Sequence, residues 1–202
     1  MKRIIALICA LLLVLSLSAC GKTSTPENTV TTFFEAMKQL DFKGMNACAT
    51  DDAQMEWNPG GSGAFSEETE QQLFDVFQKL ASKIEYSVGE ATVNDTTATV
   101  PAKVTFVDAA PLVRDVMTDV MANMVMSLLG EESDTDVYTQ MIEGLSEKVD
   151  DATLSPQTVD LQLALTETDD GWKLSAWSDE LANVLSANMS DAFADAVSSL
   201  TE

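Results

Sequence analysis

The chain has 202 residues and a formal net charge of −22, because 33 Asp and Glu residues outnumber 11 Lys and Arg residues. This charge argues against binding to a nucleic-acid backbone, which requires clustered basic residues. The chain contains no His, so a zinc-hydrolase, Ser-His-Asp or Cys-His site cannot be built from this chain alone. Its hydrophobic fraction of 46% is typical of a folded globular chain, and its length suits one domain.

The N-terminus has the pattern of a lipoprotein leader. Lys2 and Arg3 precede an apolar stretch over residues 4–17, which is too short to span a bilayer and fits the core of a secretory signal peptide. The sequence Leu17-Ser18-Ala19-Cys20-Gly21 resembles a bacterial lipobox, in which the Cys is acylated with palmitate-type chains. The alternatives are a plain signal peptide with a coincidental Cys and an uncleaved anchor.

These patterns predict a signal peptide over residues 1–19, cleavage between Ala19 and Cys20, lipid on Cys20, and a short tether that ends at residue 25. Cleavage would remove two of the 11 basic residues and none of the 33 acids, leaving a formal charge of −24. Anionic headgroups would repel such a chain, so the lipid itself would hold it at the membrane. Cys48 would be the one remaining thiol, and we expect it to be a small buried side chain.

Four features are expected in the first part of the mature chain. A helix should begin at a capping Thr-Pro pair and continue over residues 26–40. A second short helix is expected over 42–49, followed by a glycine-rich loop over 58–63. The apolar spacing then predicts a third helix over 66–84.

The central part of the chain changes to the alternation typical of strands. Residues 84–93 alternate with a shift of parity at Gly89, which indicates a β-bulge. Residues 98–106 alternate cleanly, and Pro101 within them suggests an edge strand. Residues 109–151 then interrupt the strands with two apolar helical stripes, which predict a helical hairpin insertion.

The last part of the chain predicts a β-hairpin and one helix. Residues 159–165 and 172–176 alternate on either side of Asp169-Asp170-Gly171, a strong turn signal. Ser178 should cap a final helix that continues to Leu200. Helices and antiparallel strands are segregated, so the fold class is α+β. We expect a single domain over residues 26–202.

Two stretches resemble the nuclear transport factor 2-like superfamily, in particular its bacterial lipoproteins of unknown function. One runs from Thr25-Pro26 through Phe33-Phe34 to Leu40-Asp41-Phe42, and the other is the Asp169–Leu174 turn region. The resemblance implies a strongly curved antiparallel sheet that helices wrap into a cone with an internal pocket. The predicted insertion over 109–151 departs from the minimal pattern of that superfamily.

The resemblance leaves three functions open. The leading one is a non-catalytic lipoprotein at the outer side of a bacterial cell membrane that binds a protein partner or a small apolar ligand. The second is an enzyme that uses pocket carboxylates for acid–base chemistry, as some members of the superfamily do. Such a carboxylate would need a desolvated site, and the alternation places no Asp or Glu inside the cone, so no catalytic residue is assigned. The third is a purely structural envelope protein.

No metal or cofactor is assigned. The residues Glu132, Asp134, Asp136 and Glu143 have part of the spacing of a calcium loop, but Val137 stands where that loop requires Gly. The methionines of the insertion, such as Met124, are expected to pack between its helices, with Met126 outside both apolar stripes. Trp57 either caps the core or lines the mouth of a pocket.

Overall fold

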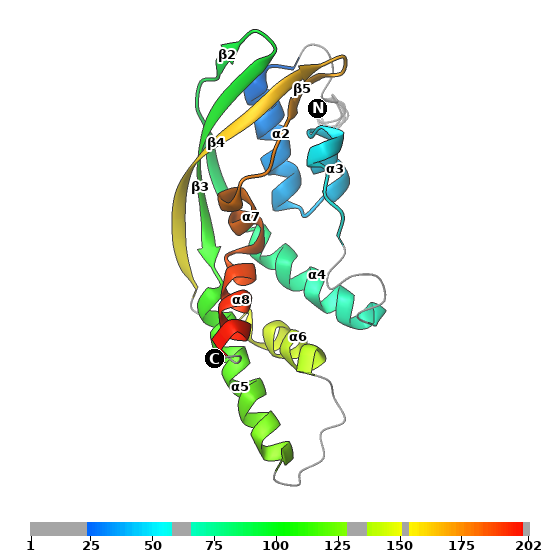
Figure 1. Cartoon of the computed structure of the whole chain (residues 1–202), viewed down its shortest axis with the longest axis vertical. Helices are drawn as coiled ribbons and strands as arrows, with labels where there is room; N and C mark the ends of the chain where they lie inside the picture. Colours follow the sequence, from blue (N-terminus) through cyan, green and yellow to red (C-terminus); the bar gives the residue numbers. More distant parts are fainter. Residues whose placement is uncertain (1–23, 58–65, 129–136, 151–153, 200–202) are drawn as a thin grey trace, which may run out of the picture.

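The computed structural model describes residues 24–57, 66–128, 137–150 and 154–199. They form a mixed α+β fold in which an open, curved antiparallel sheet of five strands packs against helices (Figure 1). This confirms the predicted fold class. The buried apolar residues form one continuous cluster between Val30 and Ala192. The described helices and strands therefore share one core.

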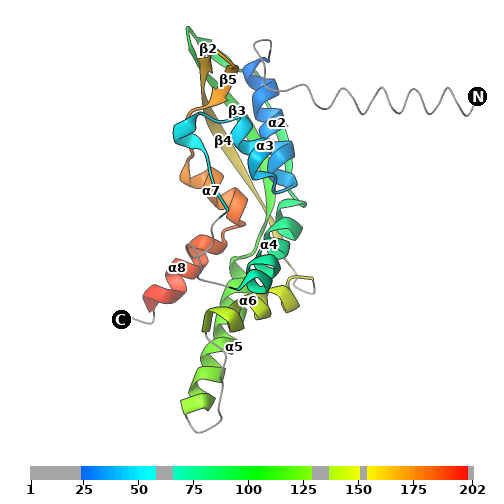
Figure 2. The same cartoon turned by 90° about the vertical axis from the view of Figure 1, so that its right-hand side faces the viewer.

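The first helix, α2 (Pro26–Lys38), begins as the sequence predicts. The Asn28 N–H donates to the Thr25 hydroxyl at 3.3 Å, and Pro26 occupies the first helical position, where its missing N–H costs nothing. Phe33 and Phe34 are almost fully buried. Figure 2 shows α2, with α3 (Phe42–Ala47) and α4 (Glu67–Ala81), lying in front of the sheet. A short 3₁₀ turn, Asp51–Ala53, follows α3.

The sheet is built around its two long strands. The strands are β1 (Glu85–Val88), β2 (Thr92–Asn94), β3 (Thr97–Asp108), β4 (Ser155–Thr168) and β5 (Gly171–Leu174). Their order is β1-β3-β4-β5, and β2 pairs with β3 on the same side as β1. Alternate residues of β3 and β4 are buried, as expected for strands with one face on the core.

The predicted bulge at Gly89 is present. Val88 pairs with Ala102 and Thr92 pairs with Thr99, so residues 89–91 face only two residues of β3. The Gly89 N–H donates to the Pro101 carbonyl at 2.8 Å. A Cβ on Gly89 would lie 2.9 Å from Pro101 Cγ, so this close approach requires glycine.

The expectation that Pro101 marks an edge strand is wrong. Strand β3 is central, and Pro101 lies opposite Gln162 of β4. The Pro101 carbonyl points to Gly89, and in an antiparallel strand the nitrogen of the same residue points the same way. The missing N–H therefore falls at the bulge, where the ladder is already interrupted.

Helix α2 also stabilises the bulge through a hydrogen bond. The Ala91 N–H donates to Glu27 Oε1 at 2.9 Å. This hydrogen bond is the main reason why the pKa of the Glu27 carboxyl is lower than its ordinary value. Glu27 lies in the first turn of α2, where a negative charge is favourable. One carboxylate thus joins the start of α2 to the edge of the sheet.

The predicted insertion consists of helices α5 (Ala110–Leu128) and α6 (Val137–Lys148), which connect β3 to β4. Asp108 and Ser155 are paired across the two strands, so the chain leaves the sheet and returns to it at neighbouring positions. Helix α6 packs on α4 and α5, and α5 packs on α8. Ion pairs join Lys79 of α4 to Asp150 and Lys148 of α6 to Asp119 of α5.

The far end of α5 is exposed, contrary to part of the sequence expectation. Val116 and Val120 are buried as predicted, but Met124 and Val125 are 40% and 53% exposed. Figure 1 shows the reason, because α5 extends past α6 and α8 at the end of the molecule opposite β2. Met126, which lies outside both stripes, is exposed as expected.

The single C-terminal helix that the sequence predicts is two helices. Helix α7 (Asp179–Ser186) begins at the expected Ser178 cap, and α8 (Met189–Ser199) follows after a break. Ala187 and Asn188 have left-handed backbone angles, with φ of 51° and 60°. Asn188 Nδ2 donates to Asp108 Oδ1 at 3.1 Å and to Gln157 Oε1 at 2.6 Å, so contacts with the sheet stabilise the break.

The contact between α5 and α6 gives a first prediction. A Cβ on Gly144 would lie 2.9 Å from Val116 Cγ1, and overpacking of this kind costs about 1–3 kcal/mol. Alanine also gains about 1 kcal/mol in helix propensity. We therefore expect Gly144→Ala to destabilise the parent chain and to stabilise the Val116→Ala variant. Chemical denaturation of the parent chain, the two single variants and the double variant measures the coupling free energy between the two positions. Equal effects of Gly144→Ala in the parent and in the Val116→Ala variant would contradict the close contact.

The Glu27 contact gives a second prediction. Because its folded-state pKa is lowered, the carboxylate stabilises the fold above the unfolded pKa of about 4.3, and this contribution disappears as pH falls through the folded pKa. We expect Glu27→Gln to lower the melting temperature near neutral pH and the difference from the parent to shrink below about pH 4. Glu90→Gln removes the same charge from an exposed residue of the bulge and is the control. A difference that does not change with pH would refute the assignment.

Candidate functional site

An open cleft of about 420 Å³ lies on the helical side of the molecule. Its walls come from the link between α2 and α3, the start of α3, the segment after the 3₁₀ turn, α4, the segment after β5, α7 and the start of α8. The lining residues are Leu40, Phe42, Met55, Glu56, Trp57, Leu73, Phe77, Trp177, Ala182, Leu185, Ser186 and Ser190. Most of these side chains are apolar or aromatic, which is the usual composition of a small-molecule site.

Trp57 forms the centre of an aromatic wall. Its ring centroid lies 5.7 Å from that of Phe42 and 5.4 Å from those of Phe74 and Phe77. The contacts with Phe74 and Phe77 are edge-to-face, with interplanar angles of 90° and 76°, an arrangement that aromatic pairs favour. Trp57 is half-buried. It also lines the cleft, which favours the second of the two roles open to it from the sequence.

The segment that carries Trp57 is fixed by one side-chain amide. The Met55 N–H donates to Asn46 Oδ1 at 2.8 Å, and Asn46 Nδ2 donates to the Met55 carbonyl at 2.7 Å. Asn46 lies on α3, so the residues after the 3₁₀ turn are held against that helix. The aromatic wall is positioned in this way without belonging to a helix or strand.

The second tryptophan of the cleft presents its ring and not its N–H. Trp177 Nε1 donates to the Ala53 carbonyl at 2.8 Å. The Trp177 ring packs edge-to-face on Phe33 of α2, with centroids 5.5 Å apart. Because its donor is already used, Trp177 can offer a ligand only its apolar surface.

The part of the cleft wall that α7 and α8 form depends on the break between these two helices. Leu185 and Ser186 lie in the last turn of α7, and Ser190 lies in the first turn of α8. The left-handed residues Ala187 and Asn188 turn the chain between them. A continuous helix would carry Ser190 past the cleft, so the break helps to shape this wall.

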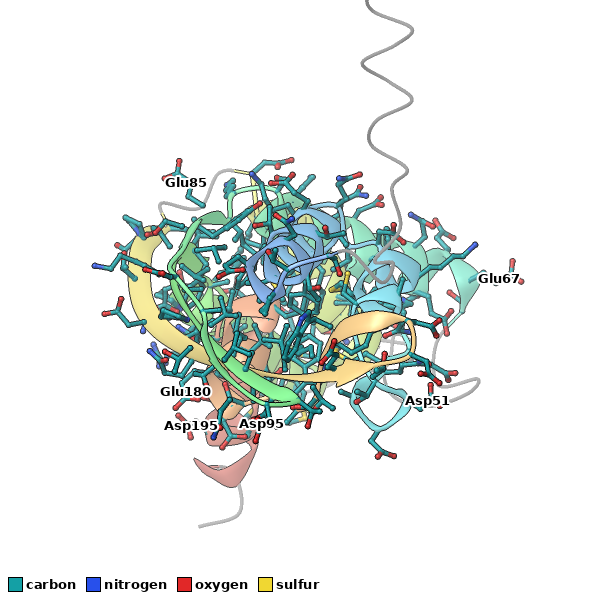
Figure 3. The ribbon with its side chains drawn as sticks, turned by 90° about the horizontal axis from the view of Figure 1, so that it is seen from above. Asp51, Glu67, Glu85, Asp95, Glu180 and Asp195 are labelled. Carbon is teal, nitrogen blue, oxygen red and sulfur yellow. The ribbon has the colours of Figure 1, made fainter. Side chains whose placement is uncertain are left out.

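The charges at the cleft are negative. Glu56 is the one charged residue among the described lining residues, and its side chain is exposed. The first turn of α4 carries Glu67, Glu68 and Glu70. In Figure 3, Asp51, Glu67 and Glu180 point outward from the body, so the acids surround the protein and leave its interior apolar.

The tyrosine that could serve acid–base chemistry lies elsewhere. The Tyr86 hydroxyl donates to Glu35 Oε1 at 2.6 Å, and its ring stacks on Phe34 with centroids 4.9 Å apart. Burial and the Glu35 contact raise the pKa of Tyr86 well above its ordinary value, so the phenol stays protonated. The side chain of the second tyrosine, Tyr138, lies outside the described residues.

Several predicted site residues also lie outside the described residues, namely Ala19, Cys20, Glu132, Asp134 and Asp136. Glu143 is exposed on α6. Among residues 24–57, 66–128, 137–150 and 154–199, no group of three Asp, Glu, Cys or His side chains could hold a metal ion. In the same part of the chain, no helix is both long and apolar enough to span a bilayer.

Cys48 is fully buried, which confirms the expectation that it behaves as a small core residue. Its carbonyl accepts a hydrogen bond from the Leu174 N–H at 2.8 Å, and Thr50 donates to the Leu174 carbonyl at 2.9 Å. The residues after α3 are thereby attached to strand β5. The sequence identified Trp57 as a candidate for the cleft but missed the remaining lining residues.

Comparisons with known proteins give little further information. No protein-family model matches the chain, and no curated protein matches it in sequence. Among solved structures, the fold is similar to that of YcdA, a proposed lipoprotein of Bacillus subtilis, with 16% sequence identity and a TM-score of 0.47. The match covers 83% of this chain and 48% of YcdA, so the chain spans about half of that protein.

Proposed function

We propose that the protein is a lipid-anchored lipoprotein, exposed outside the cytoplasm of a bacterium, that binds a small apolar ligand without catalysing a reaction. The observation that carries the binding role is the aromatic cleft around Trp57. It combines an open apolar volume with half-buried aromatic side chains, which is a common form of ligand site. The leader sequence that ends at Cys20 supports the anchor.

Catalysis remains the alternative function, with acid–base carboxylates in the cleft. An acid or base of this kind needs a site that shifts its pKa toward neutrality. Glu56 is exposed at the cleft, and the buried polar residues of the described part are Thr29, Thr69 and Ser186. These observations favour binding over catalysis.

A distant relationship to the nuclear transport factor 2-like superfamily is also part of the proposal. It is supported by the curved antiparallel sheet and by α2, which packs against the sheet through Phe33 and Phe34. The cleft lies on this helical side of the sheet. Ligand binding in that position agrees with the pocket that the superfamily resemblance implies.

The anchor gives a third prediction. In a bacterial host supplied with an azide-tagged fatty acid, we expect the parent chain to be labelled and to sediment with membranes. Cys20→Ala should abolish both the label and the cleavage after Ala19, because it removes the acylated thiol. Cys48→Ala should leave labelling unchanged, since that thiol is buried in the core. Labelling that survives in the Cys20→Ala variant would refute the proposed anchor.

The cleft gives a fourth prediction. N-phenyl-1-naphthylamine, an uncharged apolar dye, should bind residues 21–202 and become fluorescent, with energy transfer from Trp57 and Trp177. Ala182→Phe adds a large side chain to a residue that lines the cleft and should weaken binding at least about tenfold, as expected for a blocked pocket.

The matched control for this measurement is Ala122→Phe. Ala122 is also an exposed helical alanine, but it lies near the exposed apolar end of α5. Unchanged binding in the Ala122→Phe variant, together with weaker binding in the Ala182→Phe variant, would place the dye in the cleft. The reverse result would assign binding to the end of α5 and would overturn the proposed function.

A further inference from the structure

The charge of the cleft lining limits the chemistry of its ligand. Among the described lining residues, Glu56 carries a charge and no Lys or Arg is present. Lys43 follows the lining residue Phe42 on α3, but it is not part of the cleft wall. An anionic group that entered the cleft would find no cation among these lining residues.

Two of the four side-chain hydrogen-bond donors among the described lining residues donate to backbone carbonyls of the protein. Trp177 Nε1 donates to the Ala53 carbonyl, and the Ser186 hydroxyl donates to the Asn183 carbonyl. A carboxylate or phosphate that loses its water needs donors or cations in exchange. Because the described lining residues include no cation, the cleft is a costly site for such a group, whereas a hydroxyl or ammonium group can use the Glu56 carboxylate as an acceptor.

The acidic residues around the cleft also disfavour the binding of anionic groups. The helices beside the cleft begin with acidic turns, Glu67 and Glu68 on α4 and Asp179 and Glu180 on α7. Figure 3 shows Glu67 and Glu180 pointing outward from the body. The net charge of −22 adds a general repulsion of anions, which salt weakens. Aromatic ring faces, by contrast, attract cations, and the cleft lining includes the half-buried rings of Phe42, Trp57 and Phe77.

From these observations we infer that the cleft selects its ligands by headgroup charge. It binds amphiphiles whose polar end is neutral or cationic, and it discriminates against amphiphiles that end in a carboxylate or a phosphate. This inference rests on the proposed binding function and adds to it the chemical class of the ligand. Glu56 is the residue that sets the preference.

Three ten-carbon probes test the inference on residues 21–202: decanol, decanoate and decyltrimethylammonium, each below its micelle concentration. Displacement of N-phenyl-1-naphthylamine measures their affinities. We expect decanol and decyltrimethylammonium to bind, and decanoate to bind at least about tenfold more weakly than decanol at low salt. About 0.5 M NaCl should reduce the difference, because it screens exposed charges.

Glu56→Gln tests the residue directly. This variant should lose about three- to tenfold in its preference for decyltrimethylammonium over decanoate, while its affinity for decanol stays the same. Asp95→Asn is the matched control, since it removes the same charge from the turn between β2 and β3, and Asn tolerates the left-handed backbone of Asp95. The control should keep the parent's preference.

The outcomes separate the inference from the function on which it rests. If decanol and the dye do not bind, the proposed ligand-binding function fails. If all three probes bind with similar affinity, or if decanoate binds most tightly, the function stands and the charge selection is wrong. A preference that is unchanged in the Glu56→Gln variant, or equally reduced in the Asp95→Asn variant, would overturn the role of Glu56.

Discussion

The pairing of β3 with β4 is the constraint on which the rest of the fold depends. The two strands stay in one register from Thr97 opposite Thr166 to Asp108 opposite Ser155. A slip by one residue would turn every buried side chain of one strand to the outer face. Because one face of both strands carries the core, this register also decides where α2 packs and where α5 and α6 leave the sheet.

The Asp108 end of the β3–β4 pair helps to shape the cleft, although Asp108 does not line it. Asp108 is the last residue of β3, and its carboxylate accepts from Asn188 Nδ2 and from the Ala110 N–H. The Ala109 N–H donates to the Ala187 carbonyl at 2.9 Å. These hydrogen bonds hold the left-handed break between α7 and α8, and that break places Ser190 in the cleft wall. The same position therefore ends the sheet and shapes the site.

Most signals that act over a few residues predicted their elements correctly, with Pro101 as the exception, whereas features that depend on distant contacts were missed. The helix caps at Thr25 and Ser178 and the bulge at Gly89 follow from local chemistry, so the sequence was sufficient for them. The break at Ala187 was missed because alanine has no preference for a left-handed backbone, and contacts from the sheet stabilise it. The cleft was missed for the same reason, since its lining comes from segments far apart in the chain.

The proposed anchor and the proposed ligand class have a common physical consequence. Residues 21–25 can extend at most about 18 Å, so a lipid on Cys20 would keep the cleft within a short distance of the membrane surface. Anionic headgroups would repel the acidic body, and the described lining residues of its cleft offer no cation to an anionic amphiphile. A protein built in this way would sample the amphiphiles that leave the membrane while rejecting the anionic lipids that form it. Binding near the surface and selection by charge would then support each other.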